Sequence, residues 1–283
     1  MNAVRSRKAP ATPRVPILMY HAVAHTPASK TYALSVSPQA FAKQMRMLND
    51  AGFTPLTTAR LAASWRHGIP LPPHPILITF DDGYEGVHRH ALPVLARHHF
   101  ASTVFVATGW IRGAHEISGA APDTMLDWHQ VRELAEAGME IGGHSHSHPQ
   151  LDQITDEQLW FEVLCCREII DEQLGRDPVS FAYPYGYSNR RVRRTVHAAG
   201  FSQSLAVGNA LARPAQGPYA LERITVRRST HLREFERLLD GREIARNFAR
   251  DRTLTKGYAL VRRSRRLMRI VTQDRRRFAS STP

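Results

Sequence analysis

The sequence predicts an α/β fold in which parallel β/α units close, or nearly close, into a barrel. Short apolar runs typical of strands alternate along the chain with segments whose apolar residues recur at helical spacing. Such alternation favours parallel strands joined through helices, with the carboxyl ends of the strands at one edge of the sheet. The chain of 283 residues, 42% of them hydrophobic, is long enough to bury the core of one such barrel.

Six apolar runs are the expected strands, and six periodic segments are the expected helices. The strands fall at 15–19, 75–80, 101–107, 140–143, 179–182 and 201–205. The helices fall at 38–51, 57–67, 86–99, 128–137, 155–174 and 189–199. Ser37 before Pro38 predicts a helix start, because serine caps helices and proline suits the first helical position. Gly138, Gly175 and Gly200 stand where three of the helices are expected to end.

Charge divides the chain into a nearly balanced body and a basic tail. The net charge is +13, and residues 242–283 alone hold 13 Lys and Arg residues against 3 Asp and Glu residues. We therefore expect a basic N-terminal segment at 1–14, a barrel domain at 15–234 and a basic helical tail at 235–283.

The sequence predicts a cytoplasmic protein without a signal peptide or transmembrane helix. No run of about 18 apolar residues is present, and the apolar run at 17–19 is far shorter than the roughly 7–15 residues of a signal peptide. The adjacent Cys165 and Cys166 lie in an expected helix, where neighbouring side chains diverge, so we expect two reduced thiols.

Two consecutive acids, Asp81 and Asp82, follow the expected strand at 75–80 and precede Gly83. Placing two carboxylates together at a barrel mouth is unfavourable unless a cation compensates them. Adjacent side chains of an extended segment point in different directions, so one carboxylate can bind a metal while the other acts as a base. Taken alone, the motif also fits an acidic turn without a metal.

Three histidines at alternate positions, His144, His146 and His148, follow the expected strand at 140–143. Imidazole is a common zinc ligand, and two histidines with one carboxylate leave positions open for water and substrate. The rings of His144 and His148 share one face if the segment is a helix or a turn. Together with Asp82 they predict a site for a divalent metal, Zn²⁺ before other transition metals. A base beside this site accepts a proton from the metal-bound water.

Taken together, the two motifs resemble the polysaccharide deacetylase family, also called the NodB-homology family or carbohydrate esterase family 4. Residues 79–83, Thr-Phe-Asp-Asp-Gly, carry the resemblance with the later His-Ser-x-x-His at 144–148. Residues 17–21 and 125–130 are similar to the branch of poly-N-acetylglucosamine deacetylases. The resemblance spans roughly residues 15–230. It implies a distorted (β/α) barrel of about seven strands, to which the basic helical tail is a C-terminal extension.

The site residues of this family have counterparts at matching positions of the chain. The resemblance implies that Asp81 is the general base and that Asp82, His144 and His148 are the metal ligands. It implies that Tyr185 offers its backbone N–H to the oxyanion of the reaction.

The same resemblance extends to the substrate and to the proton donor. His21 matches a histidine that lines the site in the poly-N-acetylglucosamine branch. Tyr183, Pro184, Tyr185 and Trp128 are expected to contact the substrate, because aromatic faces suit sugar rings. Packing in the core is the alternative for each aromatic taken separately.

Two departures from the family pattern stand out. Many members have an arginine that orients the base at the position of Ala182, so here another group must position Asp81. Many members also have a late Leu-x-His that supplies the general acid, whereas residues 221–226 contain no histidine. His21 is the candidate for this acid, because it follows a strand and can reach the leaving amine.

The basic tail contains a segment, 258–271, whose apolar and arginine residues separate on a helical wheel. The apolar stripe can pack on the barrel with the arginines in water. Alternatively, residues 258–277 can lie on an anionic membrane surface, at the inner face of the membrane. A polyanion such as a phosphorylated saccharide is a third partner, and nucleic acid is unlikely.

The sequence thus predicts a metal-dependent hydrolase that removes N-acetyl groups from an amino-sugar glycan or glycoconjugate, in carbohydrate metabolism. Two alternatives remain open at this point. One is an amidase that acts on a non-sugar acyl amide or a cyclic imide. The other is a non-catalytic protein that binds a saccharide or a membrane, which the missing arginine, the missing late histidine and the basic tail favour.

Overall fold

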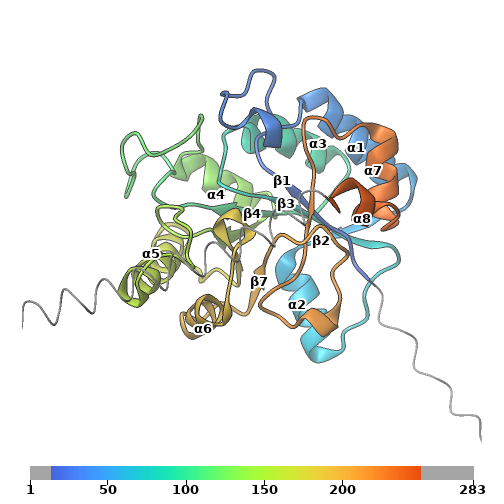
Figure 1. Ribbon diagram of the computed structural model, residues 1–283. Coiled ribbons are helices and arrows are strands. Elements are labelled where there is room, and N and C mark those ends of the chain that lie inside the picture. Colours follow the sequence, from blue (N-terminus) through green and yellow to red (C-terminus); the bar gives the residue numbers. More distant parts are fainter. Residues whose placement is uncertain (1–13, 250–283) are drawn as a thin grey trace, which may run out of the picture.

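The computed structural model describes residues 14–249, and its centre is one curved sheet of parallel strands (Figure 1). The strands are β1 (Ile17–Tyr20), β2 (Thr54–Leu56), β3 (Pro75–Phe80), β4 (Thr103–Val106), β5 (Glu140–Gly143), β6 (Ser180–Ala182), β7 (Gln203–Leu205) and β8 (Ile224–Thr225). Seven of them follow the order β7-β6-β5-β4-β3-β1-β8, and β2 pairs with the first half of β3.

The two edges of the sheet approach each other through the segment that leads into β8. The N–H of Leu221 donates to the carbonyl of Ser204 at 3.2 Å, and the N–H of Ala206 donates to the carbonyl of Leu221 at 2.8 Å. Since β8 also pairs with β1, the sheet curls into a nearly closed barrel. The predicted class, a distorted (β/α) barrel, is confirmed.

Helices surround this sheet (Figure 1). They are α1 (Pro38–Asp50), α2 (Thr58–His67), α3 (Leu92–Arg97), α4 (Trp128–Glu136), α5 (Asp156–Leu174), α6 (Arg190–Ala198), α7 (Leu232–Leu239) and α8 (Ile244–Asn247). The Ser37 hydroxyl caps α1 by accepting from the N–H of Ala40. Thr155 and Gln158 form a capping box at the start of α5, which ends at Gly175 in the left-handed conformation.

The helix predicted at 86–99 is divided into two parts. Its first part is a π-helical turn, Val87–Ala91, and α3 follows directly. Pro93 has no N–H to donate to the carbonyl of Arg89, and a proline ring crowds that carbonyl in a regular helix. The wider turn removes this conflict. Such π turns are frequent at functional sites.

The barrel domain extends beyond the boundary predicted at residues 234 and 235, which falls inside α7. Phe235 and Leu239 of this helix are buried in the main core. Ile244 and Phe248 are buried farther along, against Ile224 of β8. Residues 235–248 are therefore part of the packed domain rather than of a separate tail. The segment 258–277, proposed to contact a membrane, lies outside the described residues.

No helix among residues 14–249 is long and apolar enough to cross a membrane. The adjacent cysteines lie on α5, where Cys166 is buried and Cys165 is partly buried, and both are free thiols as expected.

Candidate metal centre

The carboxyl ends of β3 and β5 bring the two sequence motifs together. Asp81 and Asp82 follow β3 directly, and His144 follows β5, which lies beyond β4 in the sheet. The ligand atoms of Asp82, His144 and His148 lie within 4.8 Å of one another, and all three residues are buried. The three predicted metal ligands therefore converge from segments more than 60 residues apart in the chain.

These three side chains suit a metal ion. Asp82 Oδ1 is buried without a hydrogen-bond partner among the described residues. Yet it lies 3.2 Å from Nε2 of His144 and 3.3 Å from Nε2 of His148. Burial disfavours the charged carboxylate, but the two histidines outweigh this effect and hold the pKa of Asp82 well below its ordinary value. A divalent cation among these atoms would occupy the lone pairs of all three, which is the usual composition of an open zinc site.

The tautomer of His144 leaves a nitrogen available to a metal. Its Nδ1 lies 2.7 Å from the carbonyl oxygen of Ala182, which can only accept a hydrogen bond. Nδ1 therefore carries a proton, and Nε2, which faces Asp82, is the nitrogen that a metal would bind. Such a backbone contact orients many metal-binding histidines. At the position where many family members have the arginine, Ala182 thus contributes its carbonyl.

The loop that carries the histidines is a turn rather than a helix. Ser145 and His148 have positive φ angles of 66° and 60°, and the Ser145 hydroxyl accepts from the N–H of His148 at 3.1 Å. Glu162 of α5 holds the loop from outside. Its carboxylate accepts from the N–H groups of His146 at 3.0 Å and Ser147 at 2.8 Å, and from the Ser147 hydroxyl.

Two further side chains surround the histidine pair. His146 points away from it, with Nδ1 2.9 Å from the hydroxyl of Thr108. His146 therefore lies outside the group formed by Asp82, His144 and His148. The Trp110 ring packs against His148, with the ring centroids 4.4 Å apart.

Asp81, the predicted base, is held by an arginine that the family pattern does not place there. Arg223 Nη1 and Nη2 donate to the two carboxylate oxygens at 2.6 and 2.7 Å. Arg223 is 0% exposed, and its guanidinium also lies over the Phe105 ring. Burial opposes the charge on Asp81, but Arg223 outweighs it, so the pKa of Asp81 lies below its ordinary value. A group other than residue 182 therefore positions Asp81, as expected.

His21 belongs to the same cluster. It follows β1, which lies beside β3 in the sheet. Its Nδ1 is buried without a hydrogen-bond partner within residues 14–249. Burial lowers the pKa of His21, while the nearby Asp82 and Asp81 act in the opposite direction.

Three of the four residues expected to contact the substrate are buried. Tyr183 is buried, and its hydroxyl is hydrogen-bonded to Ser204 and to the carbonyl of Tyr219. Pro184 is buried as well. Trp128 is 4% exposed and packs in the main core. These side chains build the scaffold, which was the alternative stated for each aromatic.

Tyr185 is the exception among the predicted substrate contacts. It is 53% exposed, and its backbone has a φ angle of 59°. Its ring lies over His148 with the centroids 4.8 Å apart, and the ring of Tyr187 stacks beside it. Tyr185 thus forms an open aromatic wall at the edge of the metal centre.

Comparison with known proteins agrees with this arrangement. Residues 68–204 match the model of the polysaccharide deacetylase family. The chain is 27% identical over 213 residues to YxkH of Bacillus subtilis (strain 168), whose name assigns it to the polysaccharide deacetylases. This match covers 75% of the chain and 71% of YxkH. A second relative is the poly-β-1,6-N-acetyl-D-glucosamine N-deacetylase of Escherichia coli (strain K12), 22% identical over 236 residues. That match covers 71% of the chain but 35% of the relative.

Solved structures share the fold at low sequence identity. The Streptococcus pyogenes deacetylase PplD, in complex with acetate, superposes with a TM-score of 0.72 at 24% identity, over 80% of this chain and 98% of PplD. IcaB from Ammonifex degensii superposes with a TM-score of 0.68 at 22% identity, over 81% of this chain and 97% of IcaB. The segment that matches the polysaccharide deacetylase model contains Asp81, Asp82, His144 and His148.

Proposed function

We propose that this protein is a metal-dependent N-deacetylase that hydrolyses the acetamido group of an amino sugar in a glycan or glycoconjugate. One observation carries the proposal. The buried group of Asp82, His144 and His148 lies beside Asp81, an ionised carboxylate that Arg223 holds in place. The names of the relatives support N-acetylglucosamine as the sugar, since one is named as a deacetylase of poly-β-1,6-N-acetyl-D-glucosamine.

The metal is proposed to be Zn²⁺, held by Asp82 and by Nε2 of both histidines. A bound divalent cation polarises the acetyl carbonyl and makes a water molecule more acidic at neutral pH. The mixed carboxylate and imidazole ligands favour a transition metal over Mg²⁺ or Ca²⁺, which prefer oxygen ligands alone.

The residues around the metal centre are proposed to carry out the proton transfers and to stabilise the oxyanion. Asp81 accepts a proton from the attacking water, and Arg223 keeps the carboxylate ionised and oriented for this step. The backbone N–H of Tyr185 donates to the oxygen that becomes negative as the carbonyl is attacked. His21 protonates the leaving amine, and its unpartnered Nδ1 supports this assignment.

The arrangement weighs against the non-catalytic alternative. The absence of an arginine at Ala182 was one of its three supports, and Arg223, which directly precedes β8, is the partner of Asp81 instead. The other alternative, an amidase of non-sugar substrates, uses the same chemistry. It differs only in the part of the substrate that contacts the aromatic wall. The open rings of Tyr185 and Tyr187 favour a sugar there.

Two variants test the proposal. Asp81→Asn should retain zinc, as measured by elemental analysis of the purified protein, and should lose release of acetate from N-acetylglucosamine oligomers. Asp82→Asn should lose both. Asp171→Asn is the matched control, because Asp171 lies exposed on α5, and it should change neither.

The outcomes separate the alternatives. Full activity of Asp81→Asn would show that another group is the base. The amidase would be favoured if the protein binds zinc and hydrolyses small acyl amides but releases no acetate from sugar oligomers. Protein that binds no divalent metal at all would favour the non-catalytic alternative.

A further inference from the structure

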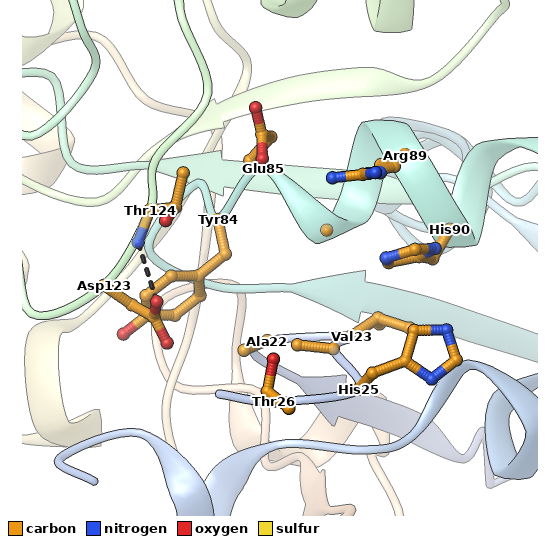
Figure 2. Close-up of a pocket in the computed structure, with 12 residues that line it drawn as sticks. Ala22, Val23, His25, Thr26, Tyr84, Glu85, Arg89, His90, Asp123 and Thr124 are labelled. Atoms are coloured by element: carbon orange, nitrogen blue, oxygen red, sulfur yellow. Dashed lines mark hydrogen bonds between the residues drawn. The ribbon is translucent and has the colours of Figure 1, made fainter. Parts of the chain in front are cut away.

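A pocket of about 250 Å³ lies beside the metal centre, and the proposed reaction does not use it. Its wall is formed by the segment after β1 and by the π-helical turn after β3. Figure 2 shows Arg89, His90 and His25 on one side of the pocket and Tyr84, Asp123 and Thr124 on the other. At this volume it can hold one sugar ring or one charged substituent rather than an oligosaccharide.

The basic side of the pocket consists of Arg89, His25 and His90. The rings of His25 and His90 meet edge to face with the centroids 5.3 Å apart. Burial and the neighbouring His25 and Arg89 lower the pKa of His90. At neutral pH its ring is therefore neutral, with one N–H to donate. Arg89 contributes a permanent positive charge, and its guanidinium can donate several hydrogen bonds to one anion.

The acids that line the same pocket are engaged elsewhere. Asp123 accepts from the N–H groups of Ala28 and Thr124 and from the hydroxyl of Thr31, at 2.7, 2.8 and 2.7 Å. Glu85 lies 3.4 Å from the guanidinium of Arg112, outside the pocket. Within residues 14–249 neither carboxylate forms an ion pair with the basic side, although the charge of Glu85 opposes the lowering of the pKa of His90. That side therefore keeps donors and positive charge for a ligand.

The pocket is a built feature rather than a gap between loops. A Cβ on Gly86 would lie 2.1 Å from the carbonyl oxygen of Val23, so only glycine lets the segment after β1 lie against the π-helical turn. The same segment is held from behind by Arg228, which donates to the carbonyls of Ala24 at 3.0 Å and His25 at 3.3 Å. These contacts hold His25 against His90, on the same side of the pocket as Arg89.

The pocket and the metal centre are continuous along two segments. Ala22, which lines the pocket, follows His21 directly. Tyr84, which also lines it, lies two residues after Asp82. Ala22 and Tyr84 also pack in one cluster with Trp110, whose ring centroid lies 4.4 Å from that of His148. A saccharide with its acetamido group at the metal can therefore extend a neighbouring substituent into the pocket.

We propose that this pocket binds an anionic group of the substrate, a phosphate or a carboxylate carried next to the sugar that loses its acetyl group. The proposal rests on the proposed deacetylase function for its orientation, but the binding of the anion does not depend on turnover. It assigns the protein to glycans that carry negative charge, rather than to neutral N-acetylglucosamine polymers.

Binding is tested on the full-length, zinc-loaded protein by NMR of the histidine rings. The signals of His25 and His90 are assigned with the variants His25→Gln and His90→Gln. Titration with inorganic phosphate and with glucuronate should shift both signals, and N-acetylglucosamine should shift neither. Phosphate that binds only at the metal would move the His144 and His148 signals instead, which would overturn the proposal. The two anions show which group, phosphate or carboxylate, the pocket accepts.

Arg89→Gln should weaken binding of the anion by about tenfold or more, the loss expected for a hydrogen bond to a charged group. Arg97→Gln is the matched control, because Arg97 lies exposed on α3 outside the pocket, and it should not change binding. Equal binding in Arg89→Gln and in the unaltered protein would refute the proposal.

A kinetic comparison connects the pocket to the substrate. N-acetylglucosamine tetramers are compared with tetrasaccharides in which glucuronate alternates with N-acetylglucosamine. Arg89→Gln should raise KM for the charged tetrasaccharide and leave kcat/KM for the neutral one unchanged. If neither releases acetate while the anions still shift His25 and His90, the proposed function fails and the anion site stands. If acetate is released and the anions shift nothing, the anion site fails alone.

Discussion

Arg223 and Asp81 form a buried ion pair with two parallel hydrogen bonds, although 142 residues separate them in the chain. The arginine comes from the segment that enters β8, on the far side of β1 from β3. At the position where the family usually has this arginine, the chain has Ala182, whose carbonyl instead orients His144. Strand β6 therefore orients His144, and the segment that enters β8 holds Asp81.

Arg223→Ala should abolish deacetylation while the protein still binds zinc. The substitution leaves the Asp81 carboxylate buried without its partner, which costs about 3–5 kcal/mol in comparable buried pairs. Asp81 then either becomes protonated or moves, and in both cases it no longer accepts a proton. Acetate release, zinc content and the free energy of unfolding in urea are the measurements.

Arg223→Lys separates charge from geometry in the same pair. Lysine keeps the positive charge but cannot make two parallel hydrogen bonds. We therefore expect a free energy of unfolding between those of Arg223→Ala and the unaltered protein, and a low kcat with KM little changed. Arg60→Ala, at an exposed position on α2, is the control for removal of an arginine. Wild-type kcat in Arg223→Lys would mean that the charge alone matters.

Glu162→Gln should weaken zinc binding, although Glu162 is not a ligand. Its carboxylate holds the histidine loop through the N–H groups of His146 and Ser147, and an amide NH₂ in its place would face those donors. Loss of such supporting contacts lowers metal affinity by roughly 10–100-fold. Competition with a chromophoric chelator measures the affinity.

The exposed Glu168 of the same helix offers a control for this prediction. Glu168→Gln should bind zinc as tightly as the unaltered protein. If Glu162→Gln lowers the melting temperature but not the zinc affinity, Glu162 supports the fold alone.

Local signals account for the elements that could be predicted. Caps such as Ser37 and Thr155, and Gly175 at a helix end, act within a few residues, so the helices they bound were placed within about two residues of their observed ends. The strands β2 and β8 were missed because two or three residues are too few to show a period. The boundary predicted at residues 234 and 235 separated α7 from the barrel, because the strong positive charge of the chain beyond it suggested a separate tail, whereas residues 235–248 carry three arginines and three acids and bury one face.

The site residues that directly follow strands could be predicted from the sequence. Those whose partners are set by contacts between distant segments could not. Asp82, His144 and His148 come in two short motifs, so their convergence follows from the parallel sheet. Arg223 has no local signature, because residues 221–226 mix three apolar residues with Glu222, Arg223 and Thr225, and its partner depends on how β8 joins β1. Trp128 could not be distinguished from a substrate contact, because burial of an aromatic is decided by the surrounding fold.

Glu140 makes stability depend on pH. It accepts hydrogen bonds from the N–H of Ala59 at 2.7 Å and from the hydroxyl of Ser180 at 2.5 Å, and burial raises its pKa above the ordinary value of 4.5. The folded state therefore binds the proton more tightly than the unfolded state. Its contribution to stability is complete below pH 4.5 and is lost as the pH rises through the folded-state pKa.

Glu140→Gln should remove the loss of stability that accompanies rising pH, because the amide does not ionise. The free energy of unfolding in urea, measured at a series of pH values, should rise for the variant relative to the unaltered protein as the pH increases. Glu136→Gln, exposed at the end of α4, should follow the unaltered protein. Parallel curves for Glu140→Gln and the unaltered protein would contradict the assignment.

Gly86→Ala should destabilise the protein and close the anion pocket together. The φ angle of Gly86 is −59°, which alanine adopts freely, so the whole effect comes from the new Cβ at 2.1 Å from the Val23 carbonyl oxygen. Overpacking of this kind costs about 1–3 kcal/mol, and the segment that carries His25 must move away from Arg89. Gly138→Ala provides the contrast, because its φ angle is 87° and no atom lies within 4 Å of a Cβ there. Its free energy of unfolding should fall by about 1–2 kcal/mol through backbone strain alone, and it should bind phosphate and glucuronate as the unaltered protein does. Equal anion binding in the two variants would show that contact between these segments does not shape the pocket.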